Sequence, residues 1–344
     1  MEEINLKDFR IIPIIESAKR LKISDEIYFS NKYADCISNS KLATINPDQG
    51  GNKIKYRDNW HQNSTSSLVL GSAIHECTLQ SEYFRLAPKC DKPTAKLGAT
   101  IDRIKYYRNK GLSIYNSIIQ SSKDCNYYVN QINNKIQKII KEGLSYYIKS
   151  KDFNDSEITL SNKDHDNCEA CVKNLQANEI IQSKLHPKDV FGDNLPSFNE
   201  DALFLDIIVT YKDRYVILKL KMKADNWTID EENKILTLND LKTTSKPVAW
   251  FMNQEYGSFY KYHYYRQFAL YLMILEQYCI KEYGFNKKWK SYGNVLVVNT
   301  IDHDTRCCSV YKDHLKLGKL EYERLLKQVA YYEIFGYEKD VKFI

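Results

Sequence analysis

The middle of the chain carries the clearest pattern of hydrophobic and polar positions. Residues 202–211 (ALFLDIIVTY) are rich in β-forming side chains, and within 215–223 apolar residues alternate with lysines. A third run of the same kind follows at 234–244. Two short polar turns, at 212–214 and 230–233, separate the three runs. The pattern therefore predicts three consecutive strands that form an antiparallel meander.

Helical spacing of apolar residues dominates on either side of these strands. Ser66 or Ser67 fits as the N-cap of a helix that runs to Gln80. Further helices are expected at 100–149 (two or three), 166–185, 256–283 and 313–335, and short strands at 294–300 and 306–311. The polar stretch 45–66 is predicted to be a long loop or a poorly ordered connection. Helices before and after a meander predict an α+β fold rather than alternating βα units.

Composition places the chain among ordinary globular proteins. Hydrophobic residues make up 43% and charged residues 27% of its 344 positions, which excludes a disordered or coiled-coil protein. The nine cysteines, an odd number without a small-scaffold rhythm, indicate reduced thiols, and no apolar run is long enough for a membrane span. We therefore expect an intracellular, cytoplasmic protein with no membrane association. The net charge of +6 permits a nucleic-acid partner without diagnosing one.

Acidic and basic residues meet in the last two predicted strands of the meander. Residues two apart in a strand share a face, so Asp240 and Lys242 project together, as do Lys221, Lys223 and Asp225. Two carboxylates on neighbouring strands can hold Mg²⁺, which prefers oxygen ligands. A nearby lysine can stabilise charge on a phosphate. On these residues alone, the alternative that Asp240 begins a turn and Lys242 is a solvated strand residue stays open.

Four motifs together resemble those of the PD-(D/E)XK nucleases, and among them the RecE-type (exonuclease VIII-like) phage exonucleases. They are the segments 70–76 (LGSAIHE), 223–225 (KAD), 240–244 (DLKTT) and 267–271 (QFALY), which occur in the order seen in that family. The resemblance covers about residues 68 to 275. It implies a restriction-endonuclease-like core, in which a central mixed sheet built on the antiparallel meander is flanked by helices.

The resemblance also implies roles for individual residues. Asp225 and Asp240 would be metal ligands, Lys242 the catalytic lysine, and His75 a further ligand at the active site. The remaining implied residues are the DNA-binding groove residues Gln267, Tyr271, Lys221 and Lys223, and the supporting residues Glu76 and Glu200. The alternatives are that His75 is a structural histidine, that Tyr271 belongs to the core, and that Glu200 is an ordinary charge before a strand.

The same resemblance organises the chain and implies its activity. Residues 1–65 would be a variable, helical N-terminal region, and 66–344 a nuclease domain with a helical insertion at about 100–185. The implied enzyme is a Mg²⁺-dependent phosphodiester hydrolase, with Mn²⁺ as a substitute, that degrades double-stranded DNA ends in the 5′-to-3′ direction. The 3′ overhangs would serve phage-type homologous recombination. A homo-oligomer, a single-strand annealing recombinase as partner, and the host cytoplasm as location of a phage-encoded protein are implied as well.

Two alternatives share the nuclease-like fold. An iron–sulfur nuclease needs four suitably spaced cysteines. The cysteines at 168, 171, 279, 307 and 308 lack that spacing, so no iron–sulfur cluster is expected. The second alternative is a non-catalytic DNA-processing protein. It would tend to lose at least one ionisable residue of the site, whereas this chain retains all of them.

Aromatic residues are unusually frequent, and 27 of them are tyrosines. Six tyrosines lie between residues 256 and 271, interleaved with cations as in surfaces that bind single-stranded nucleic acid. A purely structural role for these tyrosines is the alternative. The connection between Asp225 and Asp240 is longer than a tight hairpin needs, which predicts an inserted turn at 227–234.

Overall fold

The computed structural model describes residues 2–58, 66–87, 89, 92–93, 95–127, 131–150, 157–286 and 288–344. The chain divides into two compact units. The first consists of Met1–Asn63 together with Leu175–Ile344, and the second of Ser64–Asn174. The first unit therefore combines the two ends of the sequence, and the second is inserted between them.

The first unit is built on a six-stranded sheet in the order β2-β5-β6-β7-β8-β9. The strands are β2 (Phe9–Leu21), β5 (Ser197–Tyr211), β6 (Arg214–Asp230), β7 (Ile235–Thr244), β8 (Lys290–Asn299) and β9 (Thr305–Val310). β7 and β8 pair in parallel, and the other neighbours pair antiparallel. The prediction of an α+β fold with a mixed sheet is confirmed, and the restriction-endonuclease-like assignment stays a prediction.

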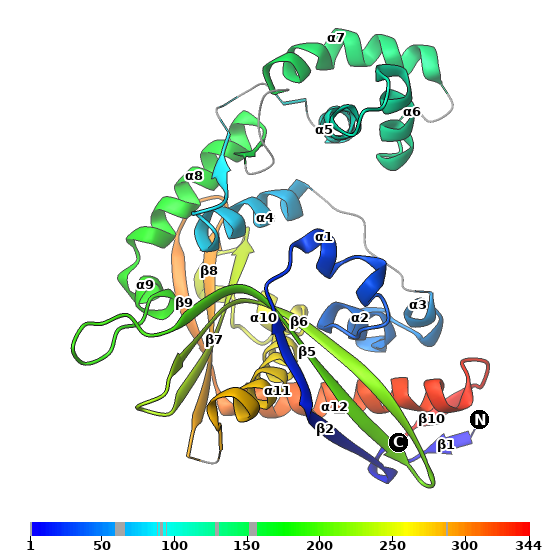
Figure 1. Ribbon diagram of the computed structural model, residues 1–344, viewed down its shortest axis with the longest axis vertical. Helices are drawn as coiled ribbons and strands as arrows, with labels where there is room; N and C mark the ends of the chain where they lie inside the picture. Colours follow the sequence, from blue (N-terminus) through cyan, green and yellow to red (C-terminus); the bar gives the residue numbers. More distant parts are fainter. Residues whose placement is uncertain are drawn as a thin grey trace. The chain divides into compact units, whose positions relative to one another are not determined.

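Two long helices, α11 (Tyr264–Tyr283) and α12 (Lys312–Phe335), pack against each other and against the sheet (Figure 1). Apolar residues that alternate along β5, such as Leu203 and Leu205, are buried in the core that these elements share. Gly318 allows α12 to approach α11 closely, because a side chain at this position would meet the backbone of α11. The two helices therefore form a fixed layer over the sheet.

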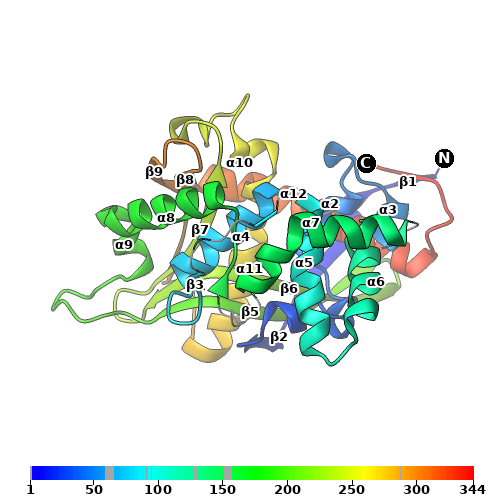
Figure 2. The same cartoon turned by 90° about the horizontal axis from the view of Figure 1, so that it is seen from above.

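Shorter elements complete the first unit. They are α1 (Asp25–Tyr28), α2 (Asn39–Ile45), α3 (Lys53–Arg57), α9 (Glu179–Leu185) and α10 (Ser258–Lys261). β1 (Glu2–Ile4) pairs in parallel with β10 (Val341–Phe343). The two ends of the chain consequently lie side by side, as both Figure 1 and Figure 2 show.

The second unit is mainly helical. Its elements are α4 (Ser66–Leu79), α5 (Ala95–Asn109), α6 (Ile114–Asp124), α7 (Ile132–Ser150), α8 (Asn162–Ala177), which extends past the unit boundary, and the paired strands β3 (Arg85–Leu86) and β4 (Glu157–Ile158). Ile101 and Ile104 of α5 and Tyr146 of α7 belong to its buried core. Among the residues described, no helix combines the length and apolarity that crossing a bilayer requires.

The structure corrects two predicted boundaries in the first half of the chain. The stretch 45–66, predicted as a loop, contains α3 and the 3-10 helix Pro47–Gln49, while its residues 59–65 lie outside the described ranges. The single helix predicted at 166–185 is two helices, α8 and α9. They separate at Asn178, whose side chain caps the start of α9.

Two further corrections lie closer to the predicted site. The helix expected at 256–283 is interrupted, because His263 has a left-handed φ of 54° between α10 and α11. The inserted turn expected at 227–234 is shorter than predicted: residues 227–230 belong to β6 and pair with β7, and the turn occupies only 231–234. Strand β2 was not predicted, since its sequence FRIIPIIESAKRL has no regular alternation and contains Pro13.

Candidate active site

Three acidic residues occupy matching positions on three adjacent strands. The register pairs Asn199 of β5 with Asn226 of β6, and Asn226 with Asn239 of β7. β6 runs antiparallel to the other two strands. The position next to these asparagines is therefore occupied by the following residue on β5 and β7 and by the preceding residue on β6. The residues at this next position, which we call the carboxylate row, are Glu200, Asp225 and Asp240.

The sheet opens at the carboxylate row. β6 and β7 pair only between Asn226 and Asp230 of β6, so the two strands separate just beyond Asn226. Asp225 stands at this fork, and its Oδ2 accepts a hydrogen bond of 2.8 Å from the backbone N–H of Leu241 on β7. On β5, Glu200 has a left-handed φ of 55°, which costs free energy for a residue with a side chain. Strained backbone of this kind is typical of functional sites.

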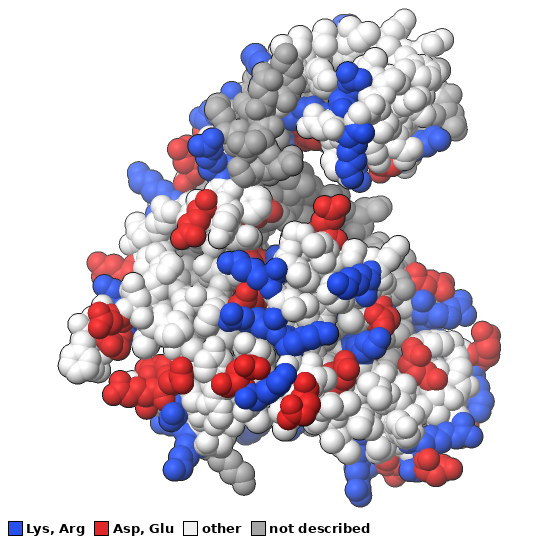
Figure 3. Space-filling view, in the orientation of Figure 1, with Lys and Arg blue, Asp and Glu red and all other residues white. Residues whose placement is uncertain are grey.

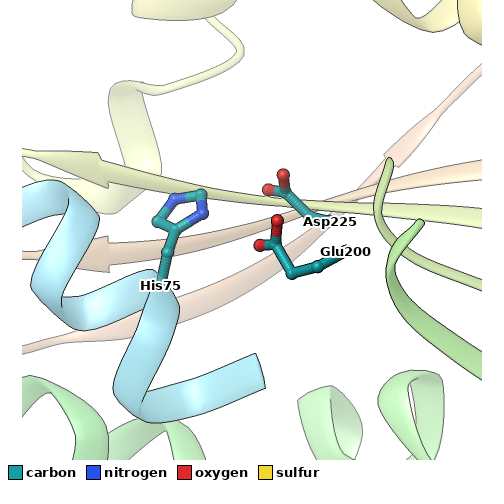
Figure 4. Close-up of side chains that lie close together, drawn as sticks. All are labelled: His75, Glu200 and Asp225. Carbon is teal, nitrogen blue, oxygen red and sulfur yellow. The ribbon is translucent and has the colours of Figure 1, made fainter. Parts of the chain in front are cut away.

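The Glu200 and Asp225 carboxylates lie close together, with oxygens within 4.8 Å of each other (Figure 4). Burial, followed by the charge of Asp225, raises the pKa of Glu200 to about 7, although Lys223 Nζ lies 2.7 Å from Glu200 Oε2 and opposes the shift. Burial also raises the pKa of Asp225. Both charged forms are therefore disfavoured, and a cation between the carboxylates would relieve this cost. Carboxylate oxygens are the donors that suit Mg²⁺.

Asp240 holds the predicted catalytic lysine. Its side chain is buried, and its Oδ2 lies 2.5 Å from Lys242 Nζ, while its Oδ1 accepts a hydrogen bond of 2.8 Å from Gln267 Nε2 of α11. Burial acts to lower the pKa of Lys242, but the charges of Asp240 and Asp225 outweigh burial and raise it. The Lys242 ammonium also lies 5.1 Å from the centre of the Tyr264 ring. Lys242 is thus kept in its charged form beside the carboxylate row.

A buried polar network fixes the start of α11, which carries Gln267. The fully buried Arg266 donates from Nη1 to Glu321 Oε1 of α12 at 2.9 Å and to Gln49 Oε1 at 2.7 Å. His263 Nδ1 lies 2.9 Å from Glu321 Oε2. Removing one partner of a buried ion pair strongly lowers the stability of a protein, so this network holds α11 in place. Sequence reasoning missed it, because the partners of Arg266 lie 55 and 217 positions away.

The two lysines predicted to bind DNA have partners within the first unit. Lys221 is buried, and its Nζ donates to the backbone carbonyls of Tyr28 and Tyr33, both at 3.0 Å. Lys223 forms ion pairs with Glu200 of the carboxylate row and with Asp25 of α1. A contact of either lysine with DNA stays a prediction.

The other predicted site residues lie on two different helices. Tyr271 is one turn after Gln267 on α11, and burial, together with nearby Tyr28 and the carboxylate row, raises its pKa well above the ordinary value. His75, drawn in Figure 4, and Glu76 lie on α4 of the second unit. Their part in a site with the carboxylate row stays a prediction.

Four asparagines, which we call the asparagine row, border the carboxylate row. Asn226 Nδ2 donates to Asn199 Oδ1 at 2.7 Å, Asn239 Nδ2 to Asn226 Oδ1 at 2.7 Å, and Asn294 Nδ2 to Asn239 Oδ1 at 2.9 Å. Asn226 and Asn239 are fully buried. Each bond joins two neighbouring strands, from β5 to β8. A slip of one residue would break the whole row, so it stabilises the register that aligns the three carboxylates.

No family model and no curated protein sequence matches this chain. Among solved structures, the chain is similar to a protein from Eubacterium rectale whose name is given as "Putative exonuclease", with 13% sequence identity, a TM-score of 0.44, and coverage of 90% of this chain and 88% of the other. A second structure, of SSO0001, has 11% identity, a TM-score of 0.22, and coverage of 78% and 88%. Similarities at this level do not indicate a function, so the functional proposal below is based on the residues of this chain.

Proposed function

We propose that the chain is a Mg²⁺-dependent deoxyribonuclease, with Mn²⁺ as a substitute ion. The observation that carries this proposal is the carboxylate row, with Lys242 held against it by Asp240. Glu200 and Asp225, whose oxygens lie within 4.8 Å of each other, would hold the ion together with Asp240. The motif that contains His75 adds this histidine as a further ligand. A structural role alone does not account for three carboxylates in matching positions at a fork in the sheet.

The carboxylate row and the side chains that contact it would have different chemical roles. A bound Mg²⁺ supplies charge neutralisation for a phosphate and a water that is easier to deprotonate. Lys242, kept as an ammonium by Asp240, donates hydrogen bonds to a phosphate oxygen as negative charge develops there. Gln267 holds the other oxygen of Asp240, which keeps this carboxylate turned toward Lys242. The cation–π contact with Tyr264 restricts the ammonium from the side of α11.

The substrate is proposed to be the end of a DNA duplex. The motif order that resembles RecE-type exonucleases supports a 5′-to-3′ exonuclease that leaves 3′ overhangs for recombination, with a single-strand annealing protein as partner and a homo-oligomer as the working form. Positively charged side chains that could attract the phosphates of DNA are also present. Figure 3 shows Lys and Arg side chains in a band across the middle of one face, over the strands labelled β5 and β6 in Figure 1.

Digestion of labelled DNA tests the proposal. Linear duplex, labelled at the 5′ or the 3′ end, and closed circular duplex are incubated with the protein in Mg²⁺ or in EDTA. We expect loss of linear DNA in Mg²⁺ alone, with early release of the 5′ label and an intact circle. Asp240→Asn should lower the rate on the order of 10²- to 10³-fold, because the negative charge of Asp240 holds Lys242 and the ion, which in turn stabilise the charge of the transition state.

Asp206→Asn is the matched control, since Asp206 is a carboxylate of β5 outside the row, and this variant should digest DNA at the normal rate. Cleavage of the circle would refute the exonuclease, and early release of the 3′ label would refute its direction. If neither DNA is cut in a metal-dependent way, the protein is not a nuclease of this kind.

A further inference from the structure

The connection between β7 and α11 presents three aromatic side chains to solvent. Trp250, Tyr256 and Tyr262 are 48%, 43% and 49% exposed. We call these three residues the aromatic surface. β7 ends at Thr244, two residues after Lys242. The connection therefore joins the strand that carries Asp240 and Lys242 to the helix that carries Gln267. Large exposed aromatic side chains that recur within one short segment indicate a binding surface more often than isolated ones do.

The inner side of the same connection is firmly packed. The Phe251 ring stacks on Tyr264 with centroids 6.0 Å apart and planes at 7°, and Phe259 is fully buried. On the outer side, the rings of Trp250 and Tyr256 contact each other edge to face, with centroids 5.3 Å apart. The aromatic surface is therefore pre-organised, and little side-chain entropy is lost when a ligand binds it.

Packed rings connect the aromatic surface to the carboxylate row. The Tyr262 ring lies 5.9 Å from the Tyr264 ring, and the Tyr264 ring lies 5.1 Å from Lys242 Nζ. Lys242 in turn is paired with Asp240. A strand whose phosphate reaches Lys242 would consequently have its neighbouring nucleotides within reach of these rings.

Two cations flank the rings. Lys246 Nζ donates to the backbone carbonyl of Tyr256 at 2.9 Å, and Lys261 Nζ lies 5.4 Å from the centre of the Tyr262 ring. Aromatic rings beside lysines are the combination that binds single-stranded nucleic acid: the rings stack on bases of any sequence, and the ammonium groups attract phosphates. In contrast, Tyr265 and Arg266 of the same tyrosine-rich segment are buried, which removes them from any such surface.

We propose that the aromatic surface binds unpaired bases of the DNA strand at the active site, by stacking on Trp250, Tyr256 and Tyr262. This inference rests on the proposed function and makes it more specific. The surface would hold bases that have left the duplex next to the phosphodiester to be cut. It would not depend on the metal, since its three rings lie outside the carboxylate row.

Binding of an oligo(dT) strand in EDTA tests this inference separately from catalysis. The variant Trp250→Ala/Tyr256→Ala/Tyr262→Ala should bind the labelled strand more weakly, by on the order of tenfold for each ring, as measured by fluorescence anisotropy. Trp250→Phe/Tyr256→Phe/Tyr262→Phe keeps the rings and should bind within a few-fold of the wild type. Tyr215→Ala/Phe191→Ala removes two other exposed rings, which are 67% and 85% exposed, and should change nothing.

Tryptophan fluorescence gives a second readout. Trp227 and Trp289 are buried, whereas Trp250 is half exposed, and Trp60 lies outside the described residues. We expect oligo(dT) to quench the wild type and to quench Trp250→Phe much less. Equal quenching of both proteins, or equal affinity of the alanine variant and the wild type, would overturn the inference.

Two comparisons separate the ways in which the two proposals can fail. A blunt duplex should lose less affinity than oligo(dT) in the alanine variant, and an equal loss would refute the preference for unpaired bases. If oligo(dT) binding depends on the rings but no DNA is digested in Mg²⁺, the proposed nuclease fails while the binding surface stands. If DNA is digested in Mg²⁺ but the alanine variant binds oligo(dT) as the wild type does, the binding surface fails while the proposed nuclease stands.

Discussion

The carboxylate row and the asparagine row lie next to each other along β5, β6 and β7, yet their chemistry differs. In the asparagine row, each amide bonds to its neighbour on the next strand, and the bonds measure 2.7 to 2.9 Å. In the carboxylate row, like charges lie within 4.8 Å, the pKa of Glu200 is raised to about 7, and the backbone at Glu200 is left-handed. One row stabilises the sheet, and the other costs stability.

This difference indicates where function lies. A sequence under selection for stability alone would replace Glu200 or Asp225 by a neutral residue, because like charges opposite each other in a sheet are unfavourable. Sites that violate the rules of stable folding are typically functional. The asparagine row then supports the carboxylate row, because it fixes the strand register against the repulsion between the neighbouring acidic side chains.

The largest effect on stability is expected in the asparagine row. Asn239→Leu conserves approximate volume but removes the partner of Asn226, Asn294 and the backbone carbonyl of Lys184. The buried side chains of Asn226 and Asn294 and the part-buried Lys184 carbonyl would each lose a hydrogen bond, at a cost of roughly 3 kcal/mol in the free energy of unfolding. Urea denaturation measures this loss.

Asn294→Leu is the matched control for that variant. Asn294 is the last member of the row, makes one bond within it, and its strand carries no member of the carboxylate row. Its replacement should cost about 1 kcal/mol. Equal losses from the two variants would show that the asparagines do not act as a connected row.

A smaller effect of opposite sign is expected in the carboxylate row. Asp225→Asn removes a buried like charge beside Glu200, while an amide oxygen can still accept the hydrogen bond from Leu241 N–H. In the absence of divalent ions, this variant should unfold with a free energy about 1 kcal/mol higher than the wild type. DNA digestion by the same variant should be lost. If Asp225→Asn is stable but inactive, the carboxylate row serves function and the asparagine row serves stability. If the variant is destabilised, Asp225 has a structural role.

The sequence predicted the strands that carry the row better than the row itself. Alternation from residue 202 to 244 was enough for β5, β6 and β7, and the motif at 240–244 marked Asp240 and Lys242. Glu200 was ranked only as a supporting residue, because a left-handed φ near the start of a strand leaves no trace in hydrophobic periodicity. The structure brings its carboxylate within 4.8 Å of that of Asp225.

Features that depend on register or on distant partners were not predictable. The asparagines pair across 27, 13 and 55 positions, and only the assembled sheet brings them into line. The break at His263 was hidden, because aromatic residues continue with helical spacing on both sides of it. Strand β2 lacks alternation, so nothing local distinguishes it from an irregular segment.

Titration with Mn²⁺, followed by electron paramagnetic resonance of the free ion, tests the central claim most directly: that the carboxylate row is a cation site. The wild type should show saturable binding. Asp225→Asn should weaken this binding by at least an order of magnitude, because a charged oxygen ligand is lost. Asn294→Leu, whose change lies outside the row, should bind Mn²⁺ as the wild type does. Saturable binding that is equal in Asp225→Asn and the wild type, or no saturable binding by the wild type, would contradict the account.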